Sequence, residues 1–201
     1  MLKQDIINYY NREIETIKLL NFDEIERALS AIMEAYERDA TIYIFGNGGS
    51  AATASHFVCD FNKGISEHFD KKFNLVCLND NFPTMMAIAN DISYEEVFSF
   101  PLKNRLKVTD LILAISGSGN SENVIKAVEY AKTVGTKVVG ITGYNGGKLK
   151  ELADYHMHVP VDDMQITEDI HIIFDANHNF KNKESQLAKL IIDYLKNRTE
   201  K

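Results

Sequence analysis

The stretch that decides the fold is Leu111-Ile112-Leu113-Ala114-Ile115-Ser116-Gly117-Ser118-Gly119-Asn120-Ser121, which is followed at once by a helical segment over 122–133. Its first half is a continuous apolar run, typical of a strand with both faces covered by other elements. Its second half consists of Ser, Gly and Asn, the residues of tight turns and helix caps. A strand, turn and helix in this order form the repeating unit of a parallel α/β sheet.

The same unit recurs on both sides of this stretch. Apolar residues at helical spacing predict two helices before the first strand, over 3–20 and from Asp23, and helical segments close the chain, from Met164 and over 184–198. We therefore predict one α/β domain over 1–201, a three-layer αβα sandwich with a five-stranded, mostly parallel sheet. The predicted strands are 41–45, 73–78, 110–116, 137–142 and 155–159.

Composition excludes several partners. The net charge of −7 repels nucleic acid and anionic lipid, so we expect neither a nucleic acid nor a membrane as partner. No apolar run approaches the ~20 residues that span a bilayer, and the first residues show no signal region, so we expect a cytoplasmic protein. Cys59 and Cys77 lack CxxC spacing and are predicted to be buried free thiols.

Two loops have the composition of a phosphate site. The first loop is Gly46-Asn47-Gly48-Gly49-Ser50, which follows the predicted strand 41–45. The second loop comprises residues 116–121 and follows the predicted strand 110–116. Backbone N–H groups at a helix N-terminus bind phosphate well, and serine hydroxyls fill its remaining acceptor directions. One such loop is explained equally well by turns and caps alone. Two of them, each at a strand-to-helix junction, favour a phosphate-containing ligand.

Gly46-Asn47-Gly48-Gly49-Ser50 followed by His56-Phe57, the pair Asn90-Asp91, and the second loop occur in an order and spacing that resemble the SIS (sugar isomerase) domain family, in particular its phosphoheptose isomerases. The resemblance implies conversion of sedoheptulose 7-phosphate to a heptose 7-phosphate. It also implies a homo-oligomer, a dimer or tetramer, with residues 1–40 at the contact. The implied substrate-binding residues are Asn47, Gly48, Gly49, Ser50, Asp91, Ser116, Gly117, Ser118, Asn120 and Ser121.

Aldose–ketose isomerisation needs a base and an acid or metal. The family's His and Glu on the helix after the first loop correspond to His56 and Asp60, and its late Gln and His correspond to Glu168 and Ala176. His178 lies two residues beyond Ala176, about 200° around a regular helix. We predict Glu168 or Asp60 as base, with His178 or a metal as electrophilic partner. The resemblance implies zinc as a candidate cofactor, with the ligands His56, Asp60, Glu168 and His178.

Two other functions stay open. The absence of a histidine at Ala176 favours a non-catalytic phosphosugar-binding regulator or assembly factor. Gly117 and Gln165, at positions where heptose isomerases have Thr and Asp, suggest an isomerase of another sugar phosphate. His171 lies on an apolar stripe and is predicted to have a core or supporting role.

Overall fold

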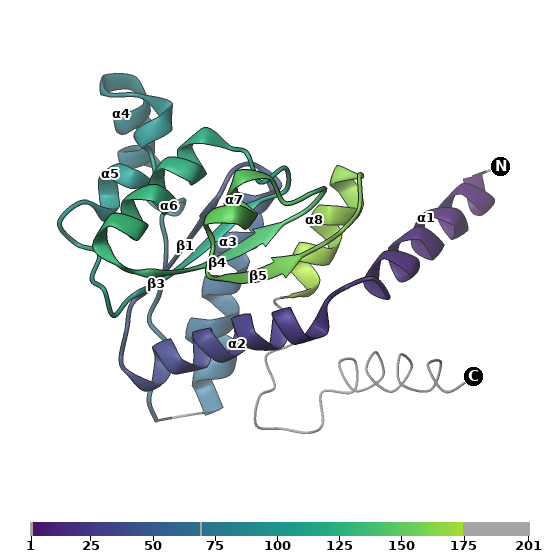
Figure 1. The fold of residues 1–201 in the computed structure, drawn as a ribbon, viewed down its shortest axis with the longest axis horizontal. Helices are drawn as coiled ribbons and strands as arrows, with labels where there is room; N and C mark the ends of the chain where they lie inside the picture. Colours follow the sequence, from purple (N-terminus) through teal and green to yellow (C-terminus); the bar gives the residue numbers. More distant parts are fainter. Residues whose placement is uncertain (1, 69, 175–201) are drawn as a thin grey trace.

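The sheet is fully parallel. The computed structural model describes residues 2–68 and 70–174, and in it five strands pair in the order β2-β1-β3-β4-β5 (Figure 1). Gly46 pairs with Ile115 and Ser116 with Thr142, so the three central strands end at one edge of the sheet. The predicted five-stranded sheet is confirmed. The strands are β1 (Ile42–Gly46), β2 (Leu75–Cys77), β3 (Leu111–Ser116), β4 (Lys137–Thr142) and β5 (Tyr155–His158).

Helices cover both faces of the sheet, which confirms the three-layer sandwich. Leu111, Leu113 and Ile115 of β3 face one apolar cluster with α2, α3 and α8. Ile112 and Ala114 face the other, with α4, α6 and α7. The helices are α1 (Leu2–Ile17), α2 (Phe22–Glu37), α3 (Gly49–Cys59), α4 (Phe82–Asp91), α5 (Ser99–Leu102), α6 (Glu122–Val134), α7 (Gly147–Leu152) and α8 (Met164–Ile173), with short helical turns at η1 (Asp60–Ile65), η2 (Ser66–His68) and η3 (Tyr94–Glu96).

Some element ends differ from the sequence prediction. The strand predicted over 73–78 is shortened to β2, because β2 is an edge strand and the N–H of Phe73 donates to the Ser66 hydroxyl (2.9 Å) outside the ladder. The prediction that both cysteines are buried was wrong for Cys59, which lies exposed at the end of α3. The predicted helix over 184–198 lies outside the described residues.

The helix α1 extends away from the rest of the molecule (Figure 1). It contacts α8, where the Tyr9 hydroxyl donates to Asp169 and Arg12 pairs with Asp163 at 2.8 Å. The residues of its outer face are apolar and exposed: Leu2, Ile6, Ile7, Tyr10 and Ile14. Among the helices described, none has the length and apolar character needed to cross a membrane.

Candidate functional site

The two loops lie side by side, because they follow the neighbouring strands β1 and β3. Gly46 packs directly against Ser50 and Ile115, so that an added methyl group would lie 2.6 Å from Ser50 Cβ and 2.8 Å from the Ile115 carbonyl oxygen. Gly48 has φ of +55°, a left-handed conformation that favours glycine. These glycines allow α3 to begin directly above the sheet edge, with Ser50 buried in its first turn.

The second loop gathers hydroxyl groups at the N-terminus of α6. The hydroxyl oxygens of Ser116 and Ser121 are 3.1 Å apart, and Ser121 is the N-cap residue of the helix. Ser118 Oγ accepts the N–H of Asn120 (3.2 Å). Since the first N–H groups of a helix have no partner within it, this loop offers both amides and hydroxyls to an anion.

Two residues predicted to bind ligand, Asn120 and Gly117, also have structural contacts within the protein. Asn120 donates to the Ser118 carbonyl (3.0 Å), and its Oδ1 accepts the N–H of Lys148 (3.1 Å), which ties the second loop to α7. Gly117 is buried, and an added methyl group would lie 2.8 Å from Met164 Sδ. Asn120 and Gly117 therefore hold the loop against α7 and α8.

The carboxylate of Glu168 lies at the N-terminus of α3. It packs against Gly49, where an added methyl group would lie 2.6 Å from Glu168 Cδ. A helix N-terminus carries partial positive charge and stabilises a carboxylate. The site is therefore polar along its length, with a carboxylate at the first loop and hydroxyls at the second.

The side chain of Asn47 is held by residues that the sequence reasoning missed. It forms a reciprocal amide pair with Asn123 of α6, both hydrogen bonds being 2.9 Å long. Tyr94 of η3 donates its hydroxyl to Asn47 Oδ1, also at 2.9 Å. Nothing in the local sequence pattern indicates these contacts, because they join segments far apart in the chain.

Asp91, which is predicted to bind substrate, has a local side-chain contact. It ends α4, is exposed, and accepts a hydrogen bond from Asn90 Nδ2 at 2.7 Å, within the same helix.

The predicted metal ligands come together only in part. His56 Nδ1 and Asp60 Oδ2 are 3.7 Å apart, as the four-residue spacing predicts. The Glu168 carboxylate lies at Gly49, about 10 Å of helix axis before His56. Within residues 2–68 and 70–174, no group of three or more His, Cys, Asp or Glu side chains is placed to hold a metal ion. His178 lies outside the described residues, which therefore do not assemble the predicted zinc site.

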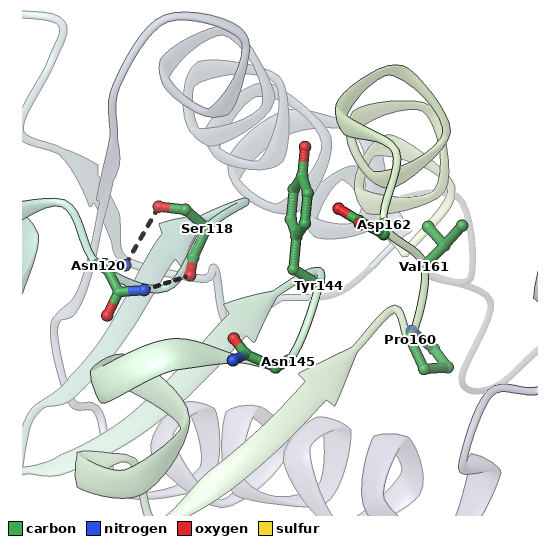
Figure 2. A pocket seen from close by; sticks show the side chains of 7 residues that line it. All are labelled: Ser118, Asn120, Tyr144, Asn145, Pro160, Val161 and Asp162. Atoms are coloured by element: carbon green, nitrogen blue, oxygen red, sulfur yellow. Dashed lines mark hydrogen bonds between the residues drawn. The ribbon is translucent and has the colours of Figure 1, made fainter.

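A groove of about 580 Å³ borders the second loop (Figure 2). Tyr144 projects into this region from the loop after β4, with φ of +50°, and its N–H donates to the Val161 carbonyl (3.1 Å). A non-glycine residue in this conformation is strained, and such strain is concentrated at functional sites. The groove is lined by Ser118, Asn120, Tyr144, Asn145, Pro160, Val161 and Asp162.

Comparison with known proteins assigns this arrangement to a family. The SIS domain matches residues 7–143, a range that contains both loops. The chain belongs to the SIS domain family. It is 38% identical over 156 residues to a probable phosphoheptose isomerase of Thermoplasma acidophilum, which covers 76% of this chain and 84% of the relative. It is 37% identical over 149 residues to the phosphoheptose isomerase of Helicobacter pylori strain P12, covering 74% and 77%.

Solved structures of two phosphoheptose isomerases share the fold. The phosphoheptose isomerase of Neisseria gonorrhoeae superimposes with a TM-score of 0.81 at 26% identity, covering 89% of this chain and 96% of that one. That of Francisella tularensis gives a TM-score of 0.80 with the same identity and coverage. The match to the SIS domain ends at the close of β4, before α8, so Glu168 is placed by the structure outside the matched range.

Proposed function

We propose that the chain is a phosphosugar isomerase that interconverts sedoheptulose 7-phosphate and an aldoheptose 7-phosphate. The relatives named phosphoheptose isomerase support this substrate. The observation that carries the proposal is the Glu168 carboxylate, which lies at the first loop beside a second loop suited to phosphate.

The charges of the two loops orient the substrate. A phosphate at the first loop would meet the Glu168 carboxylate, and like charges at close range repel each other. The second loop presents the hydroxyls of Ser116 and Ser121 at a helix N-terminus. The phosphate therefore binds at the second loop, and the carbonyl end of the sugar extends toward Glu168.

At that position Glu168 acts as the general base. It removes a proton from C-1 of the ketose and returns it to C-2 of the enediol, while a proton leaves O-1 and another is added at O-2. Unpaired N–H groups at the start of α3 stabilise the charge that develops on these oxygens. Asp60, beside His56 at the end of α3, is the second candidate for the base.

The test is turnover of sedoheptulose 7-phosphate by the wild type and by Glu168→Gln. The variant keeps the shape of the side chain and removes the base, so we expect at least a 100-fold loss of kcat, in line with general-base catalysis, with binding retained. Glu34→Gln, an exposed position on α2, is the matched control. Full activity of Glu168→Gln would assign the base to another residue, and Asp60→Asn would then be measured.

A second candidate function is phosphosugar binding without catalysis. Ala176 stands where the resemblance expects a histidine, and Asp60 where it expects a glutamate. A panel of pentose, hexose and heptose phosphates separates the candidates. Turnover of a pentose or hexose phosphate alone would identify that shorter sugar as the substrate. Binding without turnover of any sugar would show that the protein is a non-catalytic phosphosugar-binding regulator.

Zinc is a candidate further component of the site, and proton transfer by Glu168 does not require it. His56 and Asp60 offer nitrogen and oxygen donors. The resemblance adds Glu168 and His178 as further ligands, but Glu168 would have to leave its place at Gly49 to reach a metal held by His56. Metal analysis of the purified protein tests this. Stoichiometric zinc that is lost in His56→Ala would support the site, and a fully active zinc-free protein would contradict it.

The outer face of α1 supports the proposed homo-oligomer, a dimer or tetramer. Ile6, Tyr10 and Ile14 recur at one-turn spacing and are each at least 40% exposed. Burial of such a stripe against another copy would remove apolar surface from water. Light scattering on the wild type and on Ile6→Glu tests it, and a monomeric wild type would contradict it.

A further inference from the structure

The amide of Asn47 is oriented by its neighbours in a way that fixes what it can offer a ligand. We propose that Tyr94 and Asn123 are positioning residues that restrict the Asn47 side chain to donating one N–H to the substrate and prevent it from accepting a hydrogen bond. This inference rests on the proposed function only for the identity of the substrate.

The orientation follows from a backbone group that can only donate. The N–H of Val124 donates to the side chain of Asn123 at 3.0 Å, so the atom of Asn123 that it meets is the oxygen. The other end of that amide is then the NH₂ group, which donates to Asn47 at 2.9 Å. The partner atom on Asn47 is therefore its oxygen, and Asn47 Nδ2 faces Asn123 Oδ1 at 2.9 Å. Neither amide can be reversed without opposing two donors or two acceptors.

Tyr94 uses the remaining acceptor capacity of Asn47. Its hydroxyl meets Asn47 Oδ1 at 2.9 Å, and since that atom is an oxygen, Tyr94 donates. A carboxamide oxygen has two lone pairs and its nitrogen two hydrogens. Asn123 and Tyr94 occupy both lone pairs, and Asn123 occupies one hydrogen. The Asn47 side chain therefore has one N–H left to donate to a ligand.

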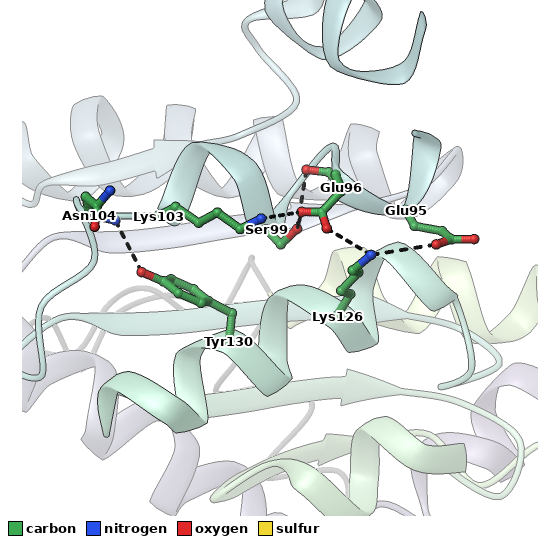
Figure 3. Close-up of polar contacts among 7 residues, drawn as sticks. All are labelled: Glu95, Glu96, Ser99, Lys103, Asn104, Lys126 and Tyr130. Carbon is green, nitrogen blue, oxygen red and sulfur yellow. Dashed lines mark hydrogen bonds and ion pairs between the residues drawn. The ribbon is translucent and has the colours of Figure 1, made fainter. Parts of the chain in front are cut away.

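The position of Tyr94 depends on how η3 is anchored. Tyr94 itself is 57% exposed, so little packing holds it. Figure 3 shows the anchor: Glu96 of η3 pairs with Lys126 of α6 at 2.8 Å and with Lys103 at 2.9 Å. Hydrogen bonds from Lys126, Ser99 and Lys103 lower the pKa of Glu96 to about 2, so it is ionised at neutral pH. The ion pair fixes η3 on α6, the helix that also carries Asn123.

A donor at this position complements Glu168. Asn47 immediately precedes Gly48 and Gly49, where the Glu168 carboxylate lies. A carboxylate accepts hydrogen bonds, whereas the fixed Asn47 amide donates one. The first loop thus presents an acceptor and a donor, and the donor suits the carbonyl or enediolate oxygen of an isomerising sugar.

A double-mutant cycle tests the assignment. The variants are Tyr94→Phe, Asn47→Ala and both together, measured by kcat/KM with sedoheptulose 7-phosphate and, on a Glu168→Gln background, by its dissociation constant. Tyr130→Phe is the matched control, because its hydroxyl contacts the N–H of Asn104 (3.2 Å) away from the loops.

We expect Tyr94→Phe to lower kcat/KM about tenfold, as for the loss of one oriented hydrogen bond, and to have less than a twofold effect when Asn47 is already Ala. Tyr130→Phe and the affinity for inorganic phosphate should stay within twofold of wild type. An equal loss from Tyr94→Phe in both Asn47 backgrounds, or no loss in either, overturns the proposal. An inactive wild type would instead refute the proposed function, and the cycle in dissociation constants would still decide the role of Tyr94.

Discussion

His171 makes the stability of this protein depend on pH. The side chain lies on α8, is 1% exposed and stacks on Phe174, with ring centroids 6.1 Å apart. Among the described residues, neither ring nitrogen has a hydrogen-bond partner of good geometry. Burial is the main cause that lowers the pKa of His171 to about 4. A hydrogen bond with the Thr142 backbone opposes this shift in part, and the nearby His158 adds to it. The folded protein therefore keeps this imidazole neutral.

The sign and size of the effect follow from linkage. An unfolded histidine titrates near 6.5, so below that pH the unfolded chain takes up a proton that the folded chain refuses. The full stability contribution is present above pH 6.5 and is lost as the pH falls toward 4. Each pH unit in this window costs about 1.4 kcal/mol, so His171 alone removes about 3 kcal/mol by pH 4.

Urea unfolding at pH 7.5, 6.5 and 5.5, at one protein concentration, measures this loss. We expect the free energy of unfolding of the wild type to fall by at least 1 kcal/mol, a rough bound from the same relation, between pH 6.5 and 5.5. His171→Leu should fall less over the same step, whatever its stability at pH 7.5. The half-buried His156, changed to Leu, should reduce the dependence by a smaller amount. Equal pH dependence in wild type and His171→Leu would refute the reasoning.

Two further variants test the loops. Gly49→Ala places a methyl group against the Glu168 carboxylate, so kcat should fall at least about tenfold with the fold intact. The control is Gly64→Ala, whose added methyl group meets no atom within 4 Å and should leave kcat unchanged. Equal activity of the two variants would contradict the packing of Glu168 on Gly49. Ser121→Ala removes a hydroxyl from the second loop and should weaken phosphate binding about tenfold in calorimetry. Ser30→Ala, at an exposed position, is the control. Unchanged affinity of Ser121→Ala would show that the phosphate does not bind at this hydroxyl.

The sheet could be predicted because its strands have a distinctive composition. Residues 111–115 are all apolar, since both faces of β3 are covered, and the following Ser-Gly run marks the turn into α6. The end of β2 was harder to predict, because an edge strand has one partner and the ladder stops when pairing with β1 stops. Sequence patterns therefore predict buried strands better than they predict the ends of edge strands.

The contacts at the site required the structure. Asn47 and Asn123 are 76 residues apart, and no local pattern pairs them. The family resemblance selects Glu168, but its position at Gly49 depends on how α8 packs on α3. Asn120 is a residue type expected at a ligand contact, and its amide also anchors α7. Sequence alone does not separate the two roles, because turn chemistry and ligand chemistry use the same residue types.

Proton transfer by Glu168 is tested most directly by following the proton itself. The protein is incubated with sedoheptulose 7-phosphate in D₂O, and C-1 and C-2 of the sugar are observed by NMR. We expect an aldoheptose 7-phosphate with deuterium at C-2, formed by the wild type and at least 100-fold more slowly by Glu168→Gln, as expected for loss of a general base. Absence of both product and exchange at C-1 in the wild type would contradict this expectation.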